Sequence, residues 1–225
     1  GGKGLFTREI EEQLLDGSID IAVHSMKDMP TVQPDGLVLD IYLPREDVRD
    51  AFVSTGSVSI ADLAKGTRVG TSSLRRRAQL MHVRPDLDVI EFRGNVQKRL
   101  KKLTEGVASC TFLAMAGLNR LNMAHIATLA IEPEDMLPAV AQGAIGIERR
   151  SNDSVTAALL EPLHHAATGQ RLAAERAFLA ALDGSCETPI AGLATLECSE
   201  LLLRGEVLRP DGSEKLSGER RGAVG

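Results

Sequence analysis

The pattern of apolar and polar positions divides the chain into short helices and strands. Apolar residues recur every three or four positions over 5–15, which predicts an amphipathic helix that ends at Asp16-Gly17. Short apolar runs over 19–23 and 37–43 predict two buried strands. The charged stretch Arg45-Glu46-Asp47 that follows them suits a crossing between domains.

From residue 67 onward, strand, turn and helix follow one another repeatedly. The pattern predicts strands over 67–69, 88–92 and 111–115, and helices from Leu74 and over 96–103. A short helix is expected over 59–64, just before the first of these strands. Strands that alternate with helices predict a parallel or mixed sheet with helices on both faces, which is the α/β class.

The pattern changes near the end of the chain. A helix predicted over 171–182 ends at Asp183-Gly184. From Pro189 onward, short apolar runs flank the turn Pro210-Asp211-Gly212, which is typical of antiparallel strands. We therefore expect a small α+β unit after the α/β part.

Composition excludes several functions. Aromatic residues make up only 3% of the chain, with no Trp, and the formal net charge is −5. Both values argue against nucleic-acid binding, which uses aromatic platforms and basic surfaces. No apolar run is as long as a membrane span. The cysteines Cys110, Cys186 and Cys198 include no CxxC pair, so the sequence predicts neither a metal site nor a disulfide framework, and we expect a reducing, cytosolic setting.

Arginines recur where predicted strands end. Arg75, Arg76 and Arg77 open a helix directly after Gly70-Thr71-Ser72-Ser73, and such a helix N-terminus favours an anion. Further arginines follow at Arg93, Arg99 and Arg120. Because the carboxyl ends of strands line the ligand crevice of open α/β sheets, these cations predict a ligand with several carboxylates or phosphates. Successive helical residues point about 100° apart, so at least one of the three consecutive arginines should be a solvated surface charge. For each of the other arginines, too, the alternative to ligand binding is a solvated position on the surface.

Two further motifs contain candidate reactive groups. Asp28, in His24-Ser25-Met26-Lys27-Asp28, would be kept ionised by Lys27 and could stabilise a developing cation. The alternative is a surface Lys-Asp pair in a loop. Cys186 lies between Gly184 and Pro189, where a thiol can be exposed and reactive, although a lone cysteine is often inert packing.

These motifs and the stretches around them resemble the porphobilinogen deaminase family. The matching stretches are GGKGLF (1–6), DIAVHSMKDMP (20–30), REDVRDAFVS (45–54), VGTSSLRRRAQL (69–80), FRGNVQKRLKKL (92–103), LAMAGLNRL (113–121), LPAVAQGAIGIE (137–148), AERAFLAALDGSCETPI (174–190) and GERRG (218–222). They follow the family's order along the whole chain, so the resemblance is not a matter of one short motif.

The resemblance implies a transferase that joins four porphobilinogen units head to tail, releasing ammonia at each step, to give hydroxymethylbilane. Its primer is a dipyrromethane attached by a thioether to a cysteine, which by motif is Cys186. Asp28 would be the catalytic carboxylate that hydrogen-bonds the pyrrole nitrogens and stabilises the cationic azafulvene. The residues implied to bind cofactor or substrate carboxylates, or to be their polar neighbours, are Lys3 (on a flexible loop), Lys27, Thr71, Ser72, Ser73, Arg75, Arg76, Arg93, Arg99, Arg120 and Gln142.

The resemblance also implies an architecture. It has two periplasmic-binding-protein-like (type II) domains with mixed sheets, formed by 1–43 with 144–161 and by 49–137, and a small α+β domain over 166–225 that carries the cysteine. The family has a further strand-helix-strand unit before the first domain and extends beyond Gly225, so we expect both end domains to be incomplete. The implied protein is a cytoplasmic monomer, or a plastid one if a targeting segment precedes it. The alternative is a non-enzymatic two-lobed module that binds a polycarboxylate and needs no adduct at Cys186.

Overall fold

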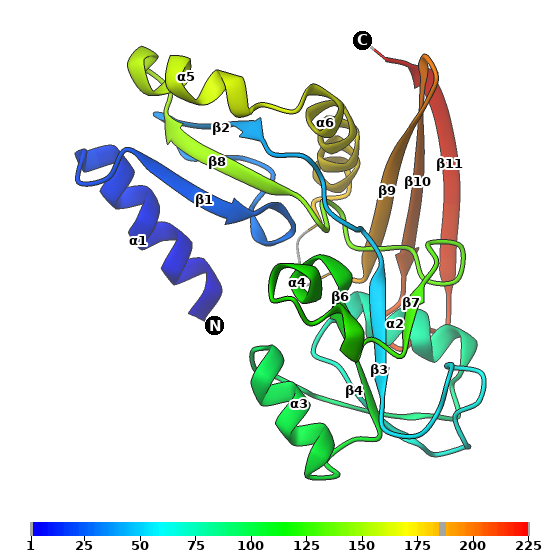
Figure 1. The fold of residues 1–225 in the computed structure, drawn as a ribbon. Coiled ribbons are helices and arrows are strands. Elements are labelled where there is room, and N and C mark those ends of the chain that lie inside the picture. Colours follow the sequence, from blue (N-terminus) through cyan, green and yellow to red (C-terminus); the bar gives the residue numbers. More distant parts are fainter. Residues whose placement is uncertain (1, 185–187, 225) are drawn as a thin grey trace.

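The computed structural model describes residues 2–184 and 188–224 of the 225-residue chain, and over 2–6 it describes the backbone alone. The described residues form three sheets, each with its own helices (Figure 1). This arrangement confirms the α/β class with a small C-terminal unit of one helix and one sheet.

The first sheet is antiparallel with the strand order β1-β8-β2. Its elements are α1 (Gly2–Asp16), β1 (Ile21–Ser25), β2 (Leu37–Tyr42), β8 (Ile145–Arg150) and α5 (Ser154–Leu160). Leu14 of α1 packs against Ala22 and Leu37, which holds this helix on the sheet. β1 leads directly into the one-turn helix η1 (Met26–Asp28), so Lys27 and Asp28 lie at the carboxyl end of this strand. The residues of β1 alternate between exposed and buried, so the expectation of a fully buried strand here is wrong.

The second sheet is mixed, with the order β5-β4-β6-β3-β7. Strands β5, β4 and β6 are parallel, whereas β3 runs antiparallel to β6 and β7. Its elements are β3 (Asp50–Ser54), β4 (Arg68–Gly70), α2 (Leu74–Val83), β5 (Asp88–Ile90), α3 (Val96–Thr104), β6 (Cys110–Ala114), α4 (Met115–Arg120), η2 (Ala124–Ile126) and β7 (Leu129–Ile131). Leu80 of α2 packs with Phe52 and Phe112 on one face, and Leu103 of α3 packs with Leu113 on the other. The sheet is therefore covered on both faces, as the sequence predicts.

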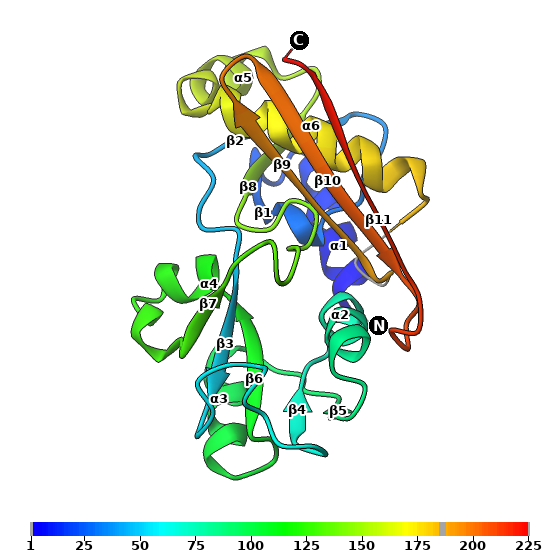
Figure 2. The same cartoon turned by 90° about the vertical axis from the view of Figure 1, so that its right-hand side faces the viewer.

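The third sheet is antiparallel with the order β11-β10-β9, and a long helix lies against one of its faces (Figure 2). Its elements are α6 (Ala166–Ala181), β9 (Ile190–Glu197), β10 (Glu200–Leu208) and β11 (Lys215–Ala223), and the short helix η3 (Glu161–Leu163) before α6 contacts α5 and β2 of the first sheet. Phe178 of α6 packs over Gly205, where an added Cβ would lie 2.6 Å from the ring. The absence of a side chain on the strand therefore lets the helix approach the sheet closely.

The chain passes between the first and second sheets twice, through 43–49 and through 132–144. The buried carboxylate of Glu175 on α6 holds both passages. It accepts hydrogen bonds from Arg45 (2.6 and 3.0 Å), from the Ala141 amide (2.7 Å) and from the Ala194 amide of β9 (2.7 Å). One side chain thus joins both connecting segments to the third sheet.

The short helix predicted over 59–64 is wrong, because this segment forms turns and bends. The Arg84 guanidinium accounts for the difference. It donates to the carbonyls of Ile60 (2.8 Å), Ala61 (3.2 Å) and Leu63 (2.7 Å), oxygens that a continuing helix would need for its own backbone.

Candidate functional site

The turn after β4 is built from the hydroxyl residues that the sequence singles out. Ser73 caps α2 by accepting a hydrogen bond from the Arg76 amide (3.4 Å), and Thr71 Oγ1 accepts one from the Ser73 amide (3.2 Å). Ser72 Oγ accepts from the Phe92 amide (3.0 Å), which ties this turn to the end of β5. These bonds fix the direction in which α2 leaves the sheet, and with it the positions of the arginines in its first turn.

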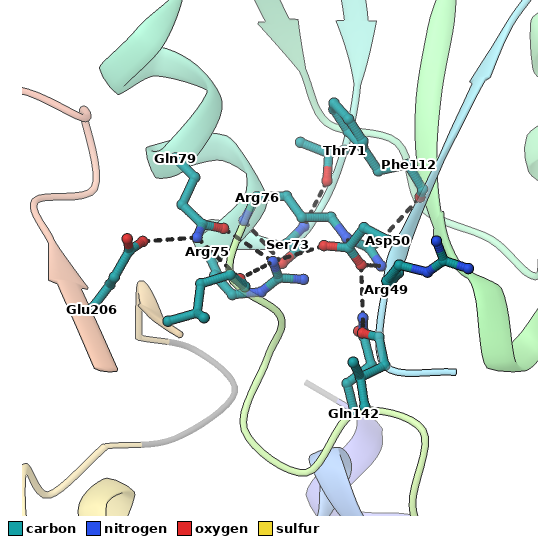
Figure 3. A network of polar contacts seen from close by, with 12 residues as sticks. Arg49, Asp50, Thr71, Ser73, Arg75, Arg76, Gln79, Phe112, Gln142 and Glu206 are labelled. Carbon is teal, nitrogen blue, oxygen red and sulfur yellow. Dashed lines mark hydrogen bonds and ion pairs between the residues drawn. The ribbon is translucent and has the colours of Figure 1, made fainter. Parts of the chain in front are cut away.

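Asp50, at the start of β3, is the centre of the site (Figure 3). Its side chain is 0% exposed and contacts two arginines of α2. Arg75 Nη1 lies 2.8 Å from Oδ2, and Arg76 Nη2 lies 2.7 Å from Oδ1. We call Asp50, Arg75 and Arg76 the arginine cluster. Burial alone would raise the pKa of Asp50, but the charges and hydrogen bonds of the two arginines outweigh it and hold this pKa well below its usual range.

The two arginines are anchored differently. Arg76 donates to Asp50 through Nε and Nη2 and to the Phe112 carbonyl through Nη1 (3.0 Å). The described contacts of Arg75 all involve Nη1, which also donates to Gln79 Oε1 (3.0 Å) and to the Leu137 carbonyl (2.9 Å). Arg75 therefore retains donors that its neighbours do not use. A rigidly held guanidinium with free donors is suited to bind a carboxylate or phosphate.

Lys27 and Asp28 face this cluster from the first sheet. The pKa of Lys27 is lowered to about 8, mainly by burial and also by the charges of Arg76 and Arg75, while Asp28 and Asp50 oppose the shift. These electrostatic interactions place the Lys27 ammonium beside the arginine cluster. Asp28 is exposed at the end of η1, next in sequence to Lys27. The structure therefore brings Lys27 of the first sheet and the arginine cluster of the second within electrostatic range of each other.

The other arginines that the sequence singles out divide into those beside the arginine cluster and those exposed on the surface. Arg99 on α3 is half-buried, and its pKa is lowered by burial and by the charge of Arg76, so it belongs beside the cluster. Arg77 is exposed, which agrees with the helical geometry expected for three consecutive residues. Arg93 and Arg120 are also exposed. Arg93 pairs with Glu91, and Arg120 is the last residue of α4.

Gln142 and Lys3 differ from what their predicted roles imply. Gln142 is buried and donates through Nε2 to Asp50 Oδ1 (2.9 Å) and to the Val48 carbonyl (2.7 Å), so it supports Asp50 from behind. The backbone of Lys3 lies in α1 and not in a loop, because the chain is helical from Gly2 to Asp16. The side chain of Lys3 and the whole of Cys186 lie outside the described residues.

Sequence reasoning did not single out Asp50. The available signal is an ionisable residue directly before the apolar run Ala51-Phe52-Val53. A carboxylate at the start of a buried strand needs a cationic partner. The sequence alone does not identify that partner. In the described part of the chain no group of three or more His, Cys, Asp or Glu residues could hold a metal ion. None of the described helices is long and apolar enough to cross a membrane.

Comparisons with known proteins agree with the geometry. A family model described as "Porphobilinogen deaminase, dipyromethane cofactor binding domain" matches residues 1–158, and one described as "Porphobilinogen deaminase, C-terminal domain" matches 170–224. The chain is 67% identical over 222 residues to a porphobilinogen deaminase of Paracoccus denitrificans (strain Pd 1222), covering 99% of this chain and 71% of the relative. It is 56% identical over 225 residues to a chloroplastic porphobilinogen deaminase of Pisum sativum, covering 99% of this chain and 61% of the relative.

Solved structures resemble the chain more distantly. A putative methionine-binding lipoprotein of Bacillus subtilis matches with a TM-score of 0.45 and 14% identity, over 70% of this chain and 75% of that one. The VFT2 domain of BvgS from Bordetella pertussis matches with a TM-score of 0.44 and 15% identity, over 76% of this chain and 72% of that one.

Proposed function

Because the chain belongs to the porphobilinogen deaminase family of transferases, we propose that it catalyses the head-to-tail condensation of four porphobilinogen molecules into hydroxymethylbilane, with release of ammonia at each step. The chain spans 71% and 61% of the two relatives, so the proposal refers to the activity of the complete protein. The observation that carries it is the convergence of Lys27, Asp28, Arg75 and Arg76 from two different sheets.

The site suits a substrate with several carboxylates. Porphobilinogen carries an acetate and a propionate group, and each needs a cationic partner when water is removed. Arg75 and Lys27 supply such partners at fixed positions, and Arg99 adds one from α3. Asp50 offsets part of this charge, so that the arginines remain in place without a ligand.

Asp28 supports the chemical step. When ammonia leaves porphobilinogen, the substrate becomes a cation, and a carboxylate at the strand end stabilises that charge as it develops. The same carboxylate accepts a hydrogen bond from a pyrrole N–H, which orients the ring. Lys27 lies next to Asp28, and its positive charge offsets the negative charge of the substrate carboxylates as they bind.

Residues 1–158 match the dipyrromethane-binding domain of the family, and the cations beside Asp28 fit that cofactor because it carries carboxylates of the same kind as the substrate. Lys27, Arg75 and Arg76, with Ser73 at the turn, would hold these carboxylates, and Cys186 would form the thioether. When bound, the dipyrromethane supplies the primer that the first substrate molecule extends. Thr71, Ser72, Gln142, Arg93, Arg99, Arg120 and Lys3 complete the proposed substrate-binding set.

The proposed domain map follows the sheets. Residues 1–43 with 144–161 form the first domain, 49–137 the second, and 166–225 the third, which bears the cofactor. We propose that the protein is a monomer of the cytoplasm or, like the relative from Pisum sativum named as chloroplastic, of the plastid.

The test combines mass spectrometry with an activity assay on the complete protein. Peptides that contain Cys186, Cys110 and Cys198 are compared, and the dipyrromethane mass should appear on Cys186 alone. Consumption of porphobilinogen is then followed on the same preparation. A protein that retains porphobilinogen without consuming it, and has an unmodified Cys186, would be a binding module and would overturn the proposal.

A further inference from the structure

A polar bridge joins the third sheet to the arginine cluster. Gln79, one turn after Arg75 on α2, donates through Nε2 to Glu206 Oε2 on β10 (3.0 Å). The same amide group donates to the Leu137 carbonyl (3.0 Å) and accepts from Arg75 Nη1 (3.0 Å) through its oxygen. Figure 3 shows Glu206, Gln79, Arg75 and Asp50 in this order, and Figure 2 shows the end of β10 against α2.

The chemistry of the bridge fixes the direction of the Gln79 amide. An ionised carboxylate accepts hydrogen bonds and cannot donate them, so Glu206 requires the amide nitrogen to face it. The Leu137 carbonyl requires the same orientation. The amide oxygen must then face Arg75, which is the contact observed. The described contacts of Arg75 all involve Nη1. This oxygen is one of the two hydrogen-bond acceptors of that nitrogen, with the Leu137 carbonyl, while Asp50 Oδ2 forms an ion pair with it.

Glu206 is also close in the sheet to the segment that follows the cysteine. It lies opposite Ala191 of β9, and the nearby Leu208 amide donates to the Pro189 carbonyl (3.0 Å). Pro189 is three residues after Cys186 in the sequence. A displacement of this end of β10 would therefore move both Pro189 and the group that orients Arg75.

We propose that Glu206 is a positioning residue that, through Gln79, orients Arg75 for carboxylate binding. This inference rests on the proposed function, since it names how that site is held. The side chain suits the role because it is only 17% exposed and is paired with Lys215 (3.3 Å), which holds its second oxygen.

A second inter-sheet contact provides a matched control. Arg204, also on β10, pairs with Glu134 (2.6 Å) in the segment between the second and first sheets. This pair also ties β10 to the rest of the molecule, through the segment that follows β7, but none of its described contacts involves Arg75, Gln79 or Asp50. If Glu206 only tied β10 to the rest of the molecule, Arg204→Ala and Glu206→Ala should have the same effect.

The experiment uses the complete protein with its cofactor and measures kcat and KM for porphobilinogen, direct binding of porphobilinogen by calorimetry, and the unfolding midpoint. Glu206→Ala should lower kcat/KM and weaken porphobilinogen binding on the order of tenfold, as for the loss of one charge-assisted hydrogen bond in a positioning chain. Glu206→Gln keeps an acceptor at the same position and should recover most of the loss. Arg204→Ala should leave both values close to those of the wild type.

A double variant decides whether the effect passes through Gln79. In a Gln79→Leu background, Glu206→Ala should cause no further loss of kcat/KM, because the connection to Arg75 is already broken. Equal kinetics and equal porphobilinogen binding in Glu206→Ala and wild type would overturn the inference, as would equal losses in Glu206→Ala and Arg204→Ala. A wild type that binds porphobilinogen without consuming it would instead contradict the proposed function, and the binding measurements would still decide the role of Glu206.

Discussion

Replacing Asp50 with Asn tests the electrostatic centre of the site. The substitution keeps the shape of the side chain but removes the only negative charge of the arginine cluster. Arg75 and Arg76 then stay buried, at 4% and 6% exposure, without a counter-ion. Removal of one partner from a buried ion pair typically costs about 3–5 kcal/mol, because the remaining charge is not compensated. For a chain of this size that loss corresponds to a decrease in the unfolding midpoint of roughly 10 °C.

The pH dependence follows from the direction of the pKa shift. The pKa of Asp50 in the folded protein lies below its ordinary value of 3.8, so its contribution to stability is present above that value and is lost as the pH falls through the folded-state pKa. The difference between wild type and Asp50→Asn should therefore be constant near neutral pH and should decrease in acid.

Thermal and urea unfolding of the complete protein measure this difference. Asp88→Asn is the control, because Asp88 pairs with Arg68 in the same sheet but both side chains are about half exposed (50% and 56%). We expect the control to unfold close to the wild type. If Asp50→Asn were as stable as Asp88→Asn at neutral pH, the two buried arginines would not depend on Asp50 and our account of the site would be wrong.

Three further predictions concern the reaction. The pKa of Lys27 is lowered to about 8, so its positive charge is lost as the pH rises through that value. The KM for porphobilinogen should therefore increase over this pH range in the wild type but stay constant in Lys27→Arg. A constant KM in the wild type would argue against carboxylate binding by Lys27. Arg76→Leu should impair cofactor assembly or turnover, measured as bound dipyrromethane and kcat/KM, whereas the exposed Arg77→Leu should behave as wild type. Asp28→Asn should lower kcat on the order of 10²-fold, because the charge that stabilises the developing cation is gone, and near-normal turnover would remove Asp28 from the mechanism.

Local periodicity was sufficient to predict the elements that position the site. Strand β4, the turn with Thr71 and the helix from Leu74 follow directly from an apolar run, small polar residues and an amphipathic pattern. Helical geometry also predicted correctly that the three consecutive arginines could not all face one ligand. These features depend on residues within one turn or one strand of each other, so the sequence contains the information locally.

The partners of the charged residues could not be predicted in the same way. Asp50 meets Arg75 and Arg76 across about 25 residues of sequence because β3 lies next to β6 in the second sheet. β8, the central strand of the first sheet, was also missed, because the charged residues of Ile-Gly-Ile-Glu-Arg-Arg conceal it. Its Glu148 is buried and pairs with His24 of β1 (2.9 Å). Such pairings depend on sheet order, which periodicity does not give.

Glu175 and Asp50, two of the buried carboxylates that sequence reasoning missed, differ in how fully their oxygens are hydrogen-bonded. Each oxygen of Glu175 accepts one hydrogen bond from Arg45 and one from a backbone amide, and Arg45 also donates through Nε to the Gln142 carbonyl (2.9 Å). All four hydrogen bonds to Glu175 come from groups of the protein, so this carboxylate is fully used in holding the connecting segments to the third sheet. At Asp50, by contrast, Oδ1 accepts from Arg76 and Gln142, whereas Oδ2 is contacted by Arg75 alone. A carboxylate ligand can therefore share the Arg75 guanidinium with Asp50 without breaking any backbone contact. We conclude that Asp50, whose oxygens are less fully hydrogen-bonded than those of Glu175, lies in the part of the molecule that can accommodate a ligand.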